Sequence, residues 1–168
     1  MKTNYLIRDF FPAFCPVGLP PLAAWLDRFG DQAPQGVQAF FGARDGGDVP
    51  WGTLGDRWNV SVDELRDVPE GRRAWEGVVT DLVASRQDLQ GGARRLVLAC
   101  GPTPLLKAAS RLAADRRWPC WLSLEEHMGC GYGVCKGCVV PVRDLDSLEG
   151  WRNANSCTEG PVFDAADL

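Results

Sequence analysis

The sequence is poor in several features that would each indicate a particular class of protein. It has one histidine, no block of basic residues, and no apolar run near the roughly 20 residues of a membrane helix. Eighteen Lys and Arg against 22 Asp and Glu give a net charge of -4, which argues against a surface that follows nucleic-acid phosphates. Residues 1–9 lack the charged head, apolar middle and cleavage site of a signal peptide. We therefore expect a soluble, cytoplasmic protein that binds neither nucleic acid nor a membrane.

Cysteine, in contrast, is frequent. Seven cysteines without a signal peptide argue against a disulfide framework and indicate metal ligands or small buried apolar side chains. For Cys15 and Cys120, which lie far apart in the chain, we expect burial. The cysteines near the end of the chain lie close together in sequence: Cys130, Cys135, Cys138 and Cys157. This distribution places the chemistry of the protein in its last part.

These clustered cysteines have the C-x4-C-x2-C…C spacing of a plant-type 2Fe-2S site, with the last one after 18 further residues. Glycines at 129, 131, 133 and 137 allow a sharply bent loop whose N–H groups reach the sulfur atoms. Zinc also takes four thiolates, but structural zinc sites usually pair two C-x2-C knuckles, and only Cys135 and Cys138 form one here. The pattern therefore predicts a 2Fe-2S site, and a non-redox, zinc-stabilised interaction module is the alternative.

Short apolar runs alternate with segments of helical period in the first two thirds of the chain, which is typical of an α/β domain with a mainly parallel sheet. The pattern predicts strands at 36–42, 58–62, 95–99 and 119–124, and helices at 21–29, 75–85 and 103–115. In the last helix, Thr103 is expected as the N-cap and Pro104 at the first position. Beyond Glu126 the helical period ends, so we predict an α/β domain at residues 1–125 and a small loop-rich domain at residues 126–168.

Three segments carry a family resemblance: Cys100-Gly-Pro-Thr-Pro-Leu-Leu-Lys107, residues 123–142, and Cys157-Thr-Glu-Gly-Pro-Val-Phe-Asp164. They resemble the electron-transfer subunit of NAD-dependent dihydroorotate dehydrogenase, a family of the ferredoxin-reductase superfamily. The resemblance covers nearly all of this chain but only the back part of a full-length member, so the leading FAD-binding barrel is expected to be absent. It implies a Rossmann-like, nucleotide-binding reductase domain with a parallel sheet, followed by a 2Fe-2S domain.

The resemblance also implies a nucleotide site. It places Cys100 and Gly101, followed by Pro102 and Thr103 at the start of a helix, beside a nicotinamide ring, although a simple strand-ending turn explains these residues equally well. Residues 14–22 align with the glycine-rich phosphate turn of the superfamily, but only Gly18 remains, among prolines that have no N–H to donate. We therefore expect weak or no binding of NAD(H), and FAD supplied by another chain.

Further polar residues of this region have two interpretations each. Arg44, Asp63 and Glu64 follow predicted strands and are either nucleotide contacts or solvated loop charges, of which we favour the second for the acids. His127, just before the cysteine loop, is either a hydrogen-bond donor to the surroundings of the cluster or a surface residue.

The predicted function is that of an electron-transfer subunit of pyrimidine biosynthesis that carries one 2Fe-2S cluster between flavins and NAD(H), and that is not self-sufficient as an enzyme. The resemblance implies a flavoprotein catalytic subunit that oxidises dihydroorotate as the partner, with the FAD barrel on a separate chain. The alternative is an iron–sulfur wiring subunit of another flavin-dependent oxidoreductase. Val162 and Phe163 are candidates for an apolar contact with the partner, unless Phe163 fills the core of its own small domain.

Overall fold

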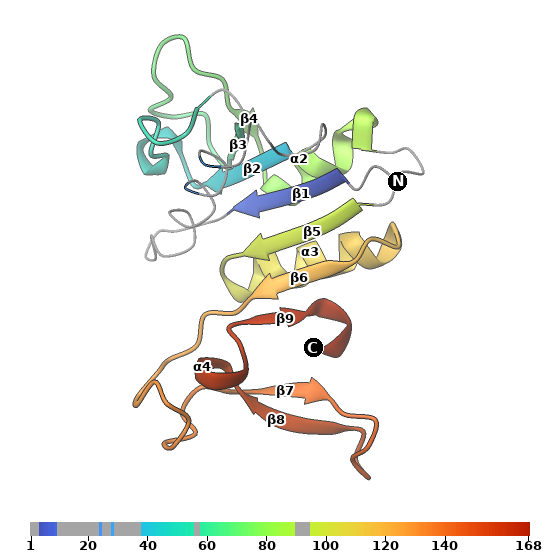
Figure 1. The fold of residues 1–168 in the computed structure, drawn as a ribbon. Helices are drawn as coiled ribbons and strands as arrows, with labels where there is room; N and C mark the ends of the chain where they lie inside the picture. The colour runs from blue at the N-terminus through green and yellow to red at the C-terminus, as the bar shows by residue number, and fades with distance from the viewer. Residues whose placement is uncertain (1–3, 10–23, 25–27, 29–37, 56–57, 90–94) are drawn as a thin grey trace.

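A parallel sheet flanked by helices forms the larger part of the molecule (Figure 1). The computed structural model describes residues 4–9, 24, 28, 38–55, 58–89 and 95–168. The strands of this sheet, in the spatial order β4-β3-β2-β1-β5-β6-β9, are β1 (Asn4–Asp9), β2 (Gln38–Ala43), β3 (Trp58–Val62), β4 (Trp75–Glu76), β5 (Arg95–Cys100), β6 (Cys120–Ser123) and β9 (Val162–Asp164). All the pairings except that of β9 are parallel, which confirms the predicted α/β class.

The strand β2 shows why this sheet is buried on both faces. Phe40 and Phe41 are successive residues with no exposed surface, and their side chains therefore point to opposite faces. Phe40 packs with the helices α2 (Val79–Ser85) and α3 (Thr103–Asp115), while Phe41 packs with Val49 and other residues of the connection that follows β2. A parallel strand covered on both faces reads as a continuous apolar run, which is the pattern of β2.

Two of the predicted helices differ from the observed ones. The segment 75–85 begins as the short strand β4, because Gly77 has φ +125 and redirects the chain before α2 begins at Val79. The bounds predicted for α3 are confirmed, but its N-cap is Pro102, no side chain caps it, and Thr103 is already helical. The predicted helix at 21–29 lies outside the described residues except for Ala24 and Arg28, as do Cys15 and Gly18.

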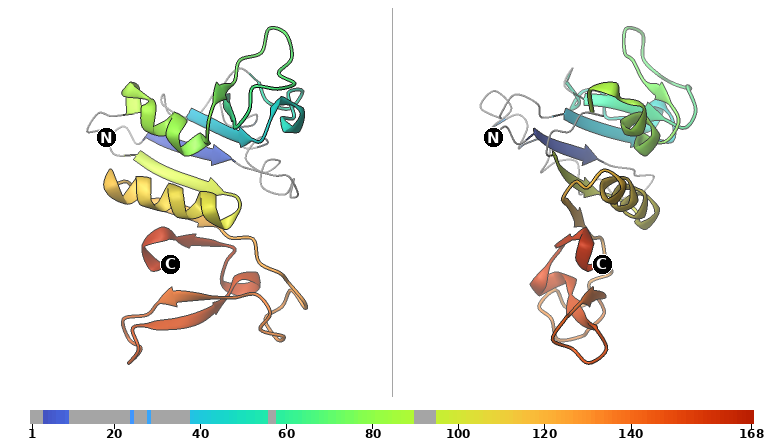
Figure 2. Two further views of the ribbon diagram at one scale, coloured as in Figure 1. Left: turned by 180° about the vertical axis from the view of Figure 1, so that it is seen from behind. Right: turned by 90° about the vertical axis from the view of Figure 1, so that its right-hand side faces the viewer.

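The last part of the chain forms a second sheet and then returns to the first one (Figure 2). The strands β7 (Val139–Arg143) and β8 (Trp151–Asn155) form an antiparallel hairpin, followed by the short helix α4 (Ser156–Glu159). The strand β9 then pairs antiparallel with β6. Short 3-10 helices complete the structure at Gly46–Asp48, Gln87–Leu89 and Ala165–Asp167.

No helix within the described ranges is long and apolar enough to cross a bilayer.

Candidate metal centre

The hairpin β7–β8 brings together two cysteines that lie far apart in the sequence. Cys138 directly precedes β7, Cys157 is in α4 directly after β8, and Val139 pairs with Asn155 at the base of the hairpin. The Ser156 N–H donates a hydrogen bond of 3.0 Å to the Cys138 carbonyl, which fixes α4 against the loop. Cys138 is buried and Cys157 is half-buried, so this end of the hairpin holds two thiols at the edge of the protein interior.

The four thiols are arranged as two interacting pairs. The side chain of Cys135 lowers the pKa of Cys130, and the side chain of Cys138 raises the pKa of Cys157. A side-chain hydrogen bond with Cys138 is the main reason that the pKa of Cys157 is raised, and burial raises it further. Charge on Cys130 also raises the pKa of Cys157, so the two pairs lie within electrostatic range of each other.

Backbone N–H groups of the loop point toward these sulfur atoms. The Cys135 N–H lies 3.4 Å from the Cys130 Sγ, and the Gly137 N–H lies 3.4 Å from the Cys135 Sγ. Hydrogen bonds from the N–H groups of Cys135 and Tyr132 lower the pKa of the Cys130 thiol to about 6. A loop that donates several N–H groups to sulfur stabilises thiolates, the form in which cysteine binds metals.

The glycines predicted to bend the loop have the required conformations at two positions. Gly131 and Gly133 have φ of +75 and +88, a region that other residues adopt at a cost. Lys136 also has a positive φ, of +58, although its type gave no indication of this. The loop turns back on itself repeatedly, which is how its N–H groups come to face inward.

Glu159 holds α4 at the base of the hairpin. Its carboxylate accepts hydrogen bonds from the Asn155 N–H at 2.8 Å and from the Arg152 guanidinium. These contacts lower the pKa of Glu159, the backbone hydrogen bond contributing most. The spacing of the cysteines did not predict these contacts of Glu159. They connect β8 to α4 through charged side chains of a kind that is common on protein surfaces.

Three apolar side chains are exposed at the loop, beside exposed charged residues. Met128, Tyr132 and Val134 are 48%, 68% and 70% exposed, and Cys135 is exposed as well. Among the described residues, no three His, Cys, Asp or Glu side chains surround one point closely enough to hold a single metal ion. His127 is exposed beside the loop. Phe163 is half-buried against the core of the hairpin, whereas Val162 is 49% exposed.

The residues predicted for a nucleotide site lie elsewhere, at the carboxyl ends of the parallel strands. Cys100 ends β5 opposite Asp9 of β1, and Gly101 follows with φ +154 before Pro102. Ligands of α/β sheets bind at this edge. The region 14–22, including Gly18, lies outside the described residues.

The acidic residues and the arginine weighed for this site are surface groups at the ends of β2 and β3. Arg44, Asp63 and Glu64 are exposed. Glu64 forms an ion pair of 2.9 Å with Arg66. Cys120, in contrast, is buried in the core, as predicted.

Comparison with known proteins gives matches to a family model and to several relatives. Residues 125–168 match the family described as the iron–sulfur cluster binding domain of dihydroorotate dehydrogenase B. The chain is 34% identical over 156 residues to the electron transfer subunit of dihydroorotate dehydrogenase B (NAD(+)) from Shouchella clausii, covering 90% of this chain and 54% of the relative. It is 36% identical over 99 residues to the corresponding subunit from Caldanaerobacter subterraneus, covering 59% of this chain and 37% of the relative.

A solved structure of an NADH-dependent reduced ferredoxin-NADP oxidoreductase has a similar fold, with a TM-score of 0.64 and 22% identity. The likeness covers 99% of this chain and 54% of that one. The chain thus spans about half the length of the Shouchella clausii subunit.

Proposed function

We propose that this chain, which is similar to electron transfer subunits of dihydroorotate dehydrogenase B over the length that it spans, transfers electrons through one 2Fe-2S cluster. The proposed ligands are Cys130, Cys135, Cys138 and Cys157. The observation that carries the proposal is the loop itself, in which paired thiols receive hydrogen bonds from the backbone. When bound, such a cluster accepts and releases one electron at a time.

The arrangement of the sulfur atoms fits a two-iron cluster. In such a cluster two thiolates bind each iron, and the thiols here form the pairs Cys130 with Cys135 and Cys138 with Cys157. A structural zinc ion instead needs all four sulfur atoms around one centre. The N–H groups directed at Cys130 and Cys135 add hydrogen bonds that stabilise thiolate charge, which supports redox use of the site.

We also propose that the chain consists of two domains. Residues 1–125 form the reductase-like sheet and residues 126–168 the cluster-binding part, although β9 of the second part completes the sheet of the first. We propose a flavoprotein as partner, the catalytic subunit of a dihydroorotate dehydrogenase. FAD would come from a polypeptide segment that this chain does not include. The apolar side chains around the loop, Met128, Tyr132 and Val134, would then contact the partner.

The turn from Cys100 to Thr103 is proposed to face a nicotinamide ring. Its position at the carboxyl end of β5, next to β1, supports this assignment. We expect only weak binding of NADH, since three prolines in residues 14–22 have no N–H to offer a pyrophosphate. Calorimetric titration of the isolated chain measures this affinity. Binding as tight as that of intact reductases would contradict the expectation.

The cluster assignment is tested by iron content and the visible spectrum after anaerobic reconstitution. Replacing any one of the four proposed ligands by serine should strip or severely destabilise the cluster, because a hydroxyl is a harder and poorer ligand for iron. Cys120→Ala is the matched control, since this buried cysteine lies in the sheet and should leave the spectrum unchanged. A normal cluster in Cys157→Ser would refute the fourth ligand. A colourless protein with stoichiometric zinc would refute the redox function.

A further inference from the structure

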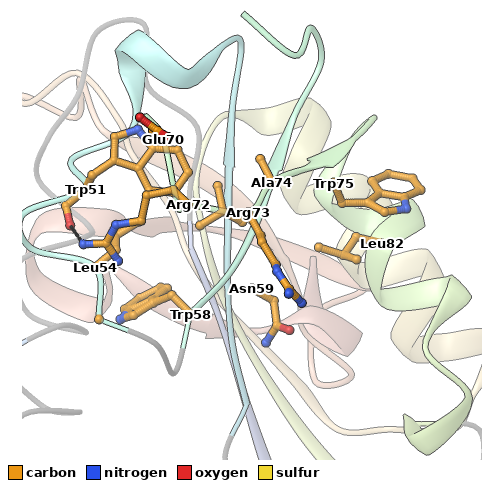
Figure 3. Close-up of a pocket in the computed structure, with 13 residues that line it drawn as sticks. Trp51, Leu54, Trp58, Asn59, Glu70, Arg72, Arg73, Ala74, Trp75 and Leu82 are labelled. Atoms are coloured by element: carbon orange, nitrogen blue, oxygen red, sulfur yellow. Dashed lines mark hydrogen bonds between the residues drawn. The ribbon is translucent and has the colours of Figure 1, made fainter. Parts of the chain in front are cut away.

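A pocket of about 810 Å³ lies at the β4 edge of the seven-stranded sheet (Figure 3). Its walls come from the connection before β3, the first half of β3, and the segment that leads into β4, with Leu82 of α2 at one end. The volume is within the range of small-molecule sites, which is about 300–1,000 Å³. None of the residues proposed for the cluster or the nicotinamide lines this pocket.

Three tryptophans supply the aromatic surface of the pocket. The indole of Trp51 is fixed in place, because its Nε1–H donates a 2.8 Å hydrogen bond to the Gly46 carbonyl. Arg72 lies over the same ring, 6.0 Å from its centroid, and donates to the Trp51 carbonyl at 3.1 Å. Trp58 is half-buried and Trp75 is 37% exposed, so both retain ring surface that protein atoms do not cover.

Arg73 supplies a positive charge to the pocket. Within the described part of the chain its guanidinium has no hydrogen bond or ion pair, and Figure 3 shows it directed into the pocket toward Asn59. Asn59 does not serve as its partner, because the Asn59 amide donates to the Ala39 carbonyl at 3.0 Å and accepts from Arg86 at 2.9 Å. The planar fork of a guanidinium matches the geometry of a carboxylate or phosphate.

We propose that this pocket binds a small planar ligand, an aromatic or heteroaromatic ring that carries one anionic group. The ring contacts the indole of Trp75, which lies on the α2 face of the sheet edge, and the anionic group pairs with Arg73. The evidence for this site is independent of the cluster and of the proposed function. A result that refutes one proposal therefore leaves the other unaffected.

Three probes of the same ring test the proposal: 2-naphthoate, 2-naphthyl phosphate and the uncharged 2-naphthamide. Calorimetry should show at least one of the anions binding about tenfold or more tightly than the amide, because the bonds to Arg73 are charge-assisted. The comparison of the two anions distinguishes a carboxylate site from a phosphate site. In nitrogen-15 NMR spectra the indole N–H signal of Trp75 should shift on binding. Equal binding of amide and anions, or no binding of any probe, would overturn the proposal.

Variants locate the interaction. Arg73→Gln should weaken binding of the preferred anion about tenfold and leave the amide unaffected, whereas Trp75→Leu should weaken both. Arg111→Gln removes an exposed arginine of α3 outside the pocket and is the control. The indole N–H signals of the free Arg73→Gln protein report whether its fold is intact. Undiminished anion binding by a folded Arg73→Gln variant would overturn the proposal.

Discussion

Gly131 and Gly133 both have a positive φ, but only Gly133 is also crowded. A Cβ on Gly133 would lie 3.2 Å from the Thr158 Cγ2, whereas a Cβ on Gly131 would meet nothing within 4 Å. The Gly133 N–H also donates toward Cys157. Gly133 therefore combines a conformational requirement with a packing requirement at the proposed fourth ligand.

We expect Gly133→Ala to lower retention of the cluster more than Gly131→Ala. Both variants bear the cost of a left-handed conformation, about 1 kcal/mol, and Gly133→Ala also displaces α4 through Thr158. The temperature at which the visible absorbance is lost measures the difference. If both variants lose the absorbance at the same temperature, the contact with Thr158 is unimportant.

Asp88 gives the protein a pH-dependent contribution to stability. Its pKa is lowered to about 2, chiefly by the hydrogen bond from Arg86 and next by one from Gln38. Because the folded-state pKa lies below the unfolded value near 3.8, this stabilisation is complete above that value. It is lost as the pH falls toward 2.

Asp88→Asn should therefore lower the free energy of unfolding at pH 7, by less than about 1 kcal/mol because the side chain is half-exposed. The difference from the parent protein should shrink toward pH 2. Urea unfolding at several pH values measures it, with Asp146→Asn in the exposed hairpin turn as the control. An equal loss at every pH would mean that the shape of the side chain matters rather than its charge.

At the scale of elements, β9 connects the cluster-binding part to the sheet. Phe163 faces the core of the hairpin, where Val140, Val142 and Ala154 are buried, and its neighbour Val162 points to solvent. The sequence left two interpretations for Phe163, a surface contact for a partner or a plug for its own domain. Its half-buried position favours the second.

Phe163→Ala should lower the free energy of unfolding by about 2 kcal/mol, less than for a fully buried phenylalanine. Val162→Ala is the matched control and should change it by less than about 0.5 kcal/mol. Chemical denaturation of the two variants measures both values. A loss from Val162→Ala as large as that from Phe163→Ala would contradict the assignment of the faces.

The sequence predicted four of the parallel strands, β2, β3, β5 and β6, and in β2 and β5 a continuous apolar run marks a strand covered on both faces. It missed β1, which lies between β2 and β5 in the sheet. It did not predict the hairpin β7–β8, since β8 has one buried residue, Ala154, in an otherwise polar segment. The helix predicted at 75–85 began too early because its apolar period hid the turn at Gly77.

The cysteine loop was also predicted only in part. The spacing of the cysteines was sufficient to predict a cluster site, but it did not predict which thiols form pairs or which N–H groups face them, since these depend on backbone dihedral angles. The pocket near β4 was missed entirely. Its tryptophans at 51, 58 and 75 follow no helical or strand period and come together only through the fold.

At the scale of the whole molecule, the exposed apolar side chains at the loop and at the far end of the hairpin can be compared. Tyr132 and Val134 are exposed beside the proposed cluster ligands, and Leu148 is fully exposed in the turn between β7 and β8. The two regions lie at opposite ends of the small sheet (Figure 1). Under the proposed function, only the first would take part in electron exchange with a partner.

Tyr132→Ser and Val134→Ser should slow electron transfer to or from the flavoprotein partner about tenfold without changing the cluster spectrum, because each removes apolar contact from the interface. Leu148→Ser, an equally exposed apolar residue, is the control and should have no effect. Stopped-flow mixing with the reduced partner measures the rate. Equal slowing by all three variants would indicate that the partner docks along the whole hairpin.

Ser123 and Val162 are paired neighbours on β6 and β9, so residues 124–161 leave the sheet and return to it at a single point. Joined directly by a tight turn, these two strands would make an ordinary β-hairpin. The cluster-binding segment is thus an insertion at a hairpin tip, and its two ends are separated only by the width of an antiparallel pair. Such a geometry makes the segment transplantable together with Phe163, which packs against its core: the edge hairpin of an unrelated protein offers the same two attachment points.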